Sequence, residues 1–169
     1  METRELNNSD YVADLVTLSR EFFDEYQGNH EYLFKIDRID ESNITGYFAR
    51  FVGNVNKKAF IALEQDRIIG YITVLIIDQP DYWAIKQIGH ISGLMVGKQA
   101  RRKGIASALL RSAIDYLRQQ GIRQYTVFTS VNNIAGIEFY KAAGLTPSHT
   151  TLLGEIDSIS IPSDCHRFR

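Results

Sequence analysis

The stretch VGKQARRKGIASALL, residues 96–110, joins an apolar run to an amphipathic segment through three consecutive cations. The apolar run, about residues 87–96, predicts a strand. After Gly104 the apolar residues recur at helical spacing until Gly121, which predicts a helix that ends at that glycine. The order is therefore strand, turn and helix, with the cations 101–103 at the start of the helix.

The start of this helix has the features of an anion site. The first N–H groups of a helix have no intrahelical acceptor, and the helix dipole adds positive charge there. Gly104 lacks the Cβ that would keep a phosphate from the backbone, and Ala106 is nearly as small. Two known phosphate motifs do not fit, because the Walker motif needs a glycine where Arg102 stands and the dinucleotide fingerprint needs three glycines. A solvated basic helix start is the alternative interpretation.

The rest of the chain predicts a mixed α/β (α+β) fold in three layers. The further elements are a helix capped by Ser9 or Asp10 that runs to Gly28, a helix from about Glu41 to Gly53, strands at 58–64 and 68–77 joined by a short link at 65–67, a strand at 123–129, a helix at about 133–143 and a weakly patterned strand at 150–161. Residues 29–39 are irregular. The strand at 123–129 follows a helix, so it has room for a parallel crossover, whereas the earlier hairpin is antiparallel.

Length and composition favour one domain, residues 1–169. The chain has 44% apolar residues and a formal net charge of −1, so the cations are a local concentration in a balanced protein. This balance argues against a nucleic-acid-binding domain or a membrane-surface protein. No apolar run approaches the roughly 18 residues of a spanning helix, and the N-terminus lacks an apolar signal core. We therefore expect a cytoplasmic protein.

The cysteine and histidine content predicts neither disulfides nor a metal site. Cys165 is the single cysteine, which fits a reducing compartment and leaves no basis for an acyl-cysteine intermediate. The four histidines, at positions 30, 90, 149 and 166, show no metal-ligand spacing.

Two motifs resemble those of the GNAT superfamily of N-acetyltransferases. Val96, Arg101, Gly104 and Ala106 match its coenzyme A signature, Val-x4-(Arg/Gln)-x-x-Gly-x-(Gly/Ala). The segment 133–145 is similar to its Asn-x2-(Ala)-x2-Phe-Tyr-x3-Gly-Phe segment, although glycine replaces the usual alanine at 136 and leucine the usual phenylalanine at 145. The similarity covers about residues 87–146.

The resemblance implies a GNAT-like sheet whose parallel fourth and fifth strands splay apart, and acetyl-CoA as cosubstrate. Pantetheine would lie in the gap against the backbone of 94–96, with Gly93 permitting a bulge, and the diphosphate would lie on the N–H groups of 102–106. Arg101 would support the turn. The residues so implied in cofactor binding are Leu94, Met95, Val96, Arg101, Arg102, Lys103, Gly104, Ile105, Ala106, Asn133 and Tyr140.

The resemblance also implies how the chemistry would run. Tyr140 would protonate the departing sulfur, and its alternative role is packing; Asn133, or Asn132 beside it, could instead be a helix cap. An amine of pKa about 10 costs roughly 4 kcal/mol to deprotonate near neutral pH, so a base is expected. His90 is the best candidate, against the alternative of an ordinary strand residue. Looser candidates are His30, Glu31, Asp78, Asp81 and His149.

The function that follows is transfer of the acetyl group of acetyl-CoA directly to an amine, which could belong to a small molecule, a peptide N-terminus or a lysine side chain. The alternative is a non-catalytic CoA-binding sensor or regulatory module. The acceptor would be recognised by segments 26–42 and 78–86 and by the tail after Thr146. We expect a monomer or homodimer.

Overall fold

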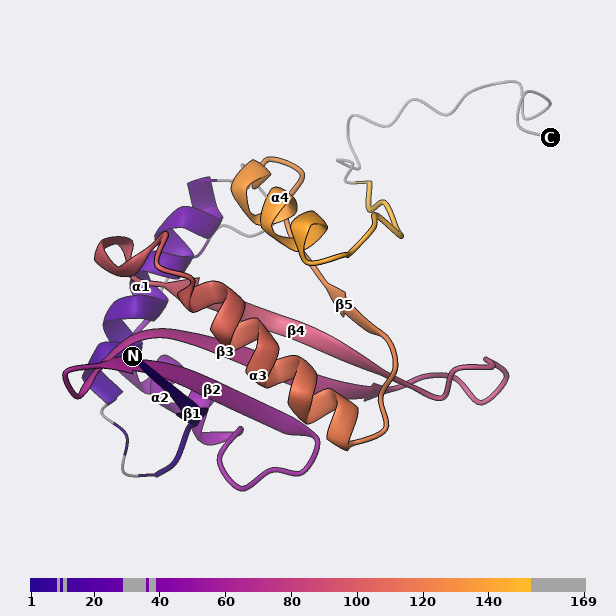
Figure 1. Cartoon of the computed structure of the whole chain (residues 1–169), viewed down its shortest axis with the longest axis horizontal. Coiled ribbons are helices and arrows are strands. Elements are labelled where there is room, and N and C mark those ends of the chain that lie inside the picture. The colour runs from indigo at the N-terminus through magenta and orange to yellow at the C-terminus, as the bar shows by residue number, and fades with distance from the viewer. Residues whose placement is uncertain (9, 11, 29–35, 37–38, 153–169) are drawn as a thin grey trace. The chain divides into compact units, whose positions relative to one another are not determined.

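The computed structural model of the chain describes residues 1–8, 10, 12–28, 36 and 39–152 (Figure 1). The chain divides into two compact units, Met1–Asn133 and Ile134–Arg169. The elements of the first unit are β1 (Glu2–Glu5), α1 (Val12–Gly28), α2 (Glu41–Ala49), β2 (Lys57–Glu64), β3 (Arg67–Asp78), β4 (Gln87–Val96), a turn of 3₁₀ helix (Lys98–Ala100), α3 (Ile105–Gln119) and β5 (Tyr125–Val127). The described part of the second unit contains α4 (Ile134–Ala142).

The sheet of the first unit has five strands in the order β1-β2-β3-β4-β5. The first three pairings are antiparallel, and β4 and β5 are parallel. Helices α1 and α2 cover one face, while α3 covers the other (Figure 1). The predicted three-layer fold with a mixed sheet is therefore confirmed.

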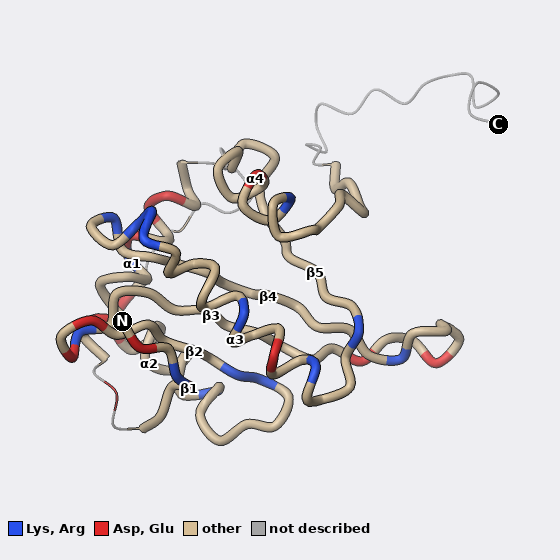
Figure 2. The backbone as a smooth tube through the Cα atoms, in the orientation of Figure 1, with Lys and Arg blue, Asp and Glu red and all other residues tan. Residues whose placement is uncertain are grey.

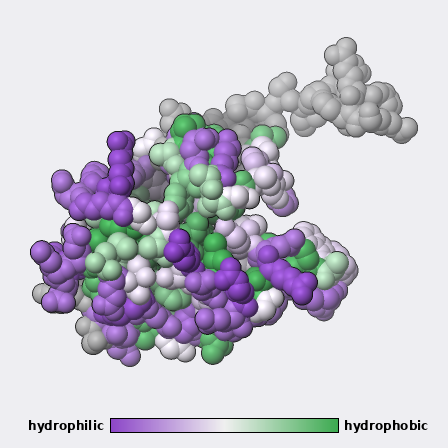
Figure 3. Space-filling view, viewed as in Figure 1, coloured by the Kyte–Doolittle hydropathy of each residue, from purple (hydrophilic) through white to green (hydrophobic). Residues whose placement is uncertain are grey.

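The main core lies between α1, α2 and the sheet. Leu15 of α1, Phe48 of α2 and Ile61 of β2 are among its buried members. On the visible face of the molecule hydrophilic residues predominate, with hydrophobic ones between them (Figure 3). The apolar residues that recur at helical spacing in α1 and α2 lie on the side of each helix that faces this core.

The first strand, β1, was not predicted from the sequence. Its four residues, ETRE, carry no apolar alternation, and their side chains are exposed or half-buried. The strand forms because its backbone pairs with β2, from Glu2 opposite Leu63 to Glu5 opposite Phe60. Charged side chains are typical of an edge strand, since they discourage further pairing.

Helices α1 and α2 differ from the predictions at their ends. Asp40 caps α2 with a capping box that includes Asn43, but the helix ends at Ala49 rather than at Gly53. Ser9 lies outside the described residues, and the Asp10 carboxylate accepts a bond from the Asn7 N–H and pairs with Arg4. The irregular segment 29–39 also lies mostly outside the described residues.

Later elements are shorter than predicted. Strand β5 has three residues instead of seven, because β4 offers it partners only as far as Ile91. Helix α4 starts one residue later than expected and ends in the turn at Gly144, where φ is +94°. Residues 150–152 are irregular, and the remainder of the expected strand at 150–161 lies outside the described residues.

Candidate active site

Strand β4 contains a β-bulge at Ser92. In the pairing with β3, Thr73 stands opposite Gly93 and Val74 stands opposite Ile91, so Ser92 has no residue opposite it. A bulge inserts one residue into a strand and changes which way the following groups point. The bulge expected beside Gly93 is therefore present, with Ser92 as its extra residue.

The bulge reverses the direction of the backbone groups along β4. The Gly89 N–H donates to Gln124 O at 2.9 Å, toward β5, whereas the Gly97 N–H donates to Ile69 O at 2.9 Å, toward β3. In a regular strand the backbone N–H groups of successive residues point alternately to the two neighbouring strands, so those of Gly89 and Gly97 would point the same way. They point opposite ways because the bulge adds one residue between them. Beyond the bulge, the N–H groups of Leu94 and Val96 therefore point away from β3.

On the side to which these two N–H groups point, no described strand pairs with β4. Strand β5 pairs with β4 at Gly89, His90 and Ile91 and ends at Val127, so the splay expected between the two parallel strands is observed. Met95 differs from its neighbours, because by the same alternation its backbone faces β3; its side chain is buried in the core.

Strand β4 leads through a turn with two left-handed residues into α3. The backbone φ angle is +61° at Arg102 and +79° at Gly104, the residue that precedes the helix. A Cβ built on Gly104 would have no protein atom within 4 Å, so the position favours glycine for its conformation and not for lack of room. No described side chain caps the helix, and the first N–H groups of α3 have no acceptor within it.

Arg101 ties the turn to the strand and to α1. Its Nε donates to Val96 O at 2.9 Å, and its guanidinium pairs with Glu25 at 2.7 Å. The Lys98 N–H also donates to Glu21 of the same helix, at 3.3 Å. Lys103 lies 4.0 Å from Glu64. Carboxylates thus accompany the cations, and the two signs are interspersed along the backbone (Figure 2).

His90 lies on β4 just before the bulge and is half-buried. Its Nδ1 is 3.0 Å from Thr126 Oγ1 on β5, and burial lowers the pKa of the imidazole. Desolvation disfavours the charged form, so the ring is held neutral and able to accept a proton. His90 stands opposite Leu75 of β3.

Asn133 and Tyr140 belong to different units. Asn133 ends the first unit, where its Nδ2 donates to Thr129 Oγ1 at 3.0 Å and its N–H donates to Ser130 O. Tyr140 lies on α4, with its ring 5.2 Å from that of Phe139. The Tyr140 carbonyl accepts the Leu145 N–H, a bond that closes the end of α4 around Gly144.

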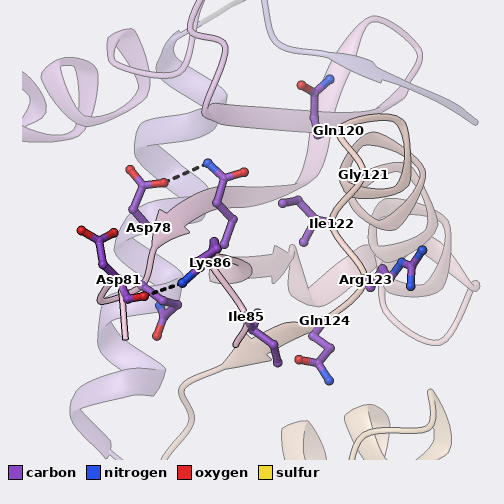
Figure 4. A pocket seen from close by; sticks show the side chains of 11 residues that line it. Asp78, Asp81, Ile85, Lys86, Gln120, Gly121, Ile122, Arg123 and Gln124 are labelled. Atoms are coloured by element: carbon purple, nitrogen blue, oxygen red, sulfur yellow. Dashed lines mark hydrogen bonds between the residues drawn. The ribbon is translucent and has the colours of Figure 1, made fainter. Parts of the chain in front are cut away.

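A cavity of about 630 Å³ lies at the opposite end of β4 from the turn (Figure 4). It is formed by the β3–β4 connection and the segment 120–124. Two of the looser candidates, Asp78 and Asp81, line this cavity, where Asp78 accepts a bond from Gln87 at 2.8 Å. These carboxylates are therefore separated from the bulge by about half of the strand, from Gln87 to Ser92.

The remaining candidates lie elsewhere. His149 contacts Ser148, with 2.7 Å between Nδ1 and Oγ. His30, Glu31, Cys165 and His166 lie outside the described residues. Within the described residues, no group of three or more His, Cys, Asp or Glu side chains is placed to hold a metal ion. In the same part of the chain no helix is long and apolar enough to cross a membrane.

Sequence reasoning missed a cluster of three hydroxyl groups at the bulge, those of Tyr47, Thr73 and Ser92. They come from α2, β3 and β4. The available signal was weak: Thr73 and Ser92 interrupt otherwise apolar strands, but only the register brings them together.

Comparison with known proteins identifies the family. The model of the Acetyltransferase (GNAT) family matches residues 13–145. N-alpha-acetyltransferase 30 of Schizosaccharomyces pombe is 27% identical over 121 residues, which cover 69% of this chain and 79% of that protein. GCN5-related N-acetyltransferase 6, chloroplastic, of Arabidopsis thaliana is 36% identical over 69 residues, but the match covers 41% of this chain and 24% of that protein.

Solved structures share the fold. A predicted acetyltransferase from Clostridium acetobutylicum, crystallised with acetyl-CoA, has a TM-score of 0.72 at 22% identity, covering 91% of this chain and 95% of that one. Aminoglycoside N-acetyltransferase AAC(6')-Iy, in complex with CoA, has a TM-score of 0.73 at 15% identity, covering 91% and 93%. Since the family match spans most of the sequence, the chain belongs to the GNAT family of acetyltransferases.

Proposed function

We propose that this protein transfers the acetyl group of acetyl-CoA directly to an amine. The observation that carries the proposal is the half-open strand β4: its pairing with β5 stops at Ile91, and the N–H groups of Leu94 and Val96 beyond that point face the open side. The same strand runs into the uncapped start of α3. One continuous backbone surface can therefore accept an extended ligand that ends in phosphates.

Each part of this surface has a proposed role. The N–H groups of Leu94 and Val96 bind the amides and the thioester carbonyl of acetyl-CoA, and those of 102–106 bind its diphosphate. Arg101 holds the strand end, the turn and α1 together through its bonds to Val96 O and Glu25. Met95 supports the surface from the core side, where its side chain is buried.

The chemistry needs a base and an acid. Acetyl-CoA supplies an activated acetyl thioester. His90, kept neutral by burial, accepts the proton that the amine loses as its nitrogen bonds to the carbonyl carbon. Tyr140 donates a proton to the sulfur when the carbon–sulfur bond breaks, and Asn133 binds the pantetheine arm. Thr126 orients the His90 ring, because its hydroxyl lies 3.0 Å from Nδ1.

A screen of amines tests the proposal. The protein and acetyl-CoA are incubated with peptides bearing free N-termini, an N-terminally blocked lysine peptide and aminoglycosides, and acetylated product is detected by mass. The relatives named above motivate the first and last of these classes. Product with at least one acceptor is expected, whereas no product above background with any of them would count against the proposal.

The second candidate function is a CoA-binding regulatory module without turnover. The binding surface on β4 and α3 would serve either function, so the two differ in the acid and the base. Tight acetyl-CoA binding without transfer, and no rate change on Tyr140→Phe, would favour the regulatory module.

We further propose that residues 1–169 act as one cytoplasmic domain, as a monomer or homodimer. The family match runs through both compact units, from residue 13 to residue 145, which supports a single functional domain. Light scattering of the purified protein measures the oligomeric state, and a mass beyond that of two chains would contradict the proposal.

A further inference from the structure

Three hydroxyl groups meet at the bulge of β4. Thr73 Oγ1 lies 2.8 Å from Ser92 Oγ and 3.1 Å from Tyr47 OH, and the latter two are 3.2 Å apart. Thr73 is fully buried, Tyr47 is half-buried and Ser92 is exposed. The cluster therefore reaches from the interior of the sheet to its surface.

The distances indicate how the three protons are used. Alternative bonds to backbone carbonyls are longer, 3.4 Å from Ser92 Oγ to Thr73 O and 3.5 Å from Thr73 Oγ1 to Gly93 O. Each hydroxyl has one proton and two acceptor sites. With each of the three protons in one of the three short contacts, every hydroxyl oxygen keeps an acceptor site and no hydroxyl keeps a proton to donate to a ligand. Such a cluster binds groups that donate hydrogen bonds.

The cluster lies on the same face of the sheet as His90. Cross-strand partners share a face, so His90 lies on the side of Leu75 and Gly93 lies on the side of Thr73. Thr73 and Leu75 are two residues apart on β3 and therefore also share a face. Helix α2 packs on that face, through the contact of Tyr47 with Thr73 and that of Phe48 with Tyr71.

The cluster also marks the point where β4 opens. Ser92 is the first residue of the strand beyond the last β5 pair, at Ile91. The surface proposed above for acetyl-CoA begins two residues later, at Leu94. A group bound by Ser92 and Tyr47 thus lies between the proposed base and the proposed thioester site.

We propose that Tyr47, Thr73 and Ser92 bind the N–H groups of the acceptor amine and determine how strongly a primary amine is preferred over its N-methylated form. This inference rests on the proposed transferase function. A neutral primary amine has two N–H donors for the acceptor sites of Tyr47 and Ser92, which leaves its lone pair for attack. A secondary amine has only one. The three members of the cluster carry no carboxylate, so they favour the ammonium form of the amine less than an ion pair would.

The experiment compares primary amines with their N-methylated forms. The probes are a peptide with a free N-terminus, an N-terminally blocked lysine peptide and sisomicin, each beside its N-methylated counterpart. Tyr47→Phe and Ser92→Ala remove one hydroxyl each. Matched controls are Tyr116→Phe and Ser112→Ala on α3, whose hydroxyls donate to Val55 O and Ala108 O. Melting temperatures confirm that all four variants fold.

The wild type is expected to prefer the primary amine by at least about tenfold in kcat/KM, in line with the loss of one well-placed hydrogen bond. The two cluster variants reduce that preference and raise KM for the amine by about tenfold, with acetyl-CoA affinity unchanged. The controls behave like the wild type. A merely structural role of the hydroxyls would not change the ratio between the primary and the methylated substrate.

Other outcomes separate this inference from the proposed function. Acetylation with the same preference in the wild type and in both cluster variants would overturn the inference and leave the function standing. In the absence of product, NMR signals of the Tyr47 ring are followed during titration of each amine into the acetyl-CoA-loaded protein. Shifts caused by primary amines alone would support the binding site and overturn the transferase function. No shifts and no product would overturn both.

Discussion

The two halves of β4 have the same neighbour on one side and different surroundings on the other. Residues 87–91 pair with β3 and, over the last three positions, with β5. Residues 93–96 pair with β3 alone. A single extra residue, Ser92, lies at the border and reverses the direction of the backbone groups. The comparison shows how one inserted residue turns the backbone groups in the second half of a central strand away from β3, on the side where β5 no longer pairs.

The largest effect is expected from the base on the paired half. His90→Gln should lower kcat by about 10²- to 10⁴-fold, because general base catalysis is lost. Burial lowers the pKa of His90, so the wild-type kcat/KM should fall on the acid side with an apparent pKa below the ordinary imidazole value of about 6.5. The pH–rate profiles of both proteins measure this. An unchanged acid limb in the variant would exclude His90 as the base.

A smaller effect, on stability, is expected from adding a methyl group at Gly89, in the half of β4 that pairs with β5. A Cβ on Gly89 would lie 2.5 Å from Leu117 Cδ1, so Gly89→Ala should lower the free energy of unfolding by about 1–3 kcal/mol. A Cβ on Gly93 in the open half would lie 3.1 Å from Thr73 Oγ1, and Gly93→Ala should cost less than about 1 kcal/mol. Urea unfolding compares the two. An equal loss of stability in the two variants, or a larger loss in Gly93→Ala, would contradict the difference in packing between the two halves.

The smallest effects concern the turn beyond the open half. Gly104→Ala should weaken acetyl-CoA binding by about tenfold or more, since the new Cβ meets no protein atom but occupies the space proposed for the diphosphate. Arg102→Ala should weaken binding by only about threefold, because exposed charge contacts contribute little. Calorimetric titration gives both affinities, with the melting temperature as control for the left-handed backbone. The reverse order would mean that charge, and not the backbone, binds the cosubstrate.

The sequence was most informative where local signals agree. The predicted strand 87–96 coincides with β4, and α3 ends at Gln119, two residues before Gly121, whose φ of +76° explains the glycine. The glycine at 93 also indicated a bulge, although the extra residue proved to be its neighbour. Patterns in the sequence thus located the strand, the turn and the helix.

Features that depend on distant pairing could not be predicted. Strand β1 forms through backbone bonds to β2 and leaves no apolar pattern, and the length of β5 depends on where β4 turns away. The hydroxyl cluster joins residues that are 26 and 19 positions apart in the sequence. Only the register of the sheet brings such side chains together.

Amide hydrogen exchange with and without acetyl-CoA tests the central claim most directly. The N–H groups of Leu94, Val96 and Ile105 should exchange more slowly in the presence of acetyl-CoA, because they become hydrogen-bonded donors. The Gly89 N–H, already bonded to Gln124 O, should not change. Slower exchange around residues 89–91 with no change at Leu94 and Val96 would contradict the claim that the bulge opens β4 to the cosubstrate.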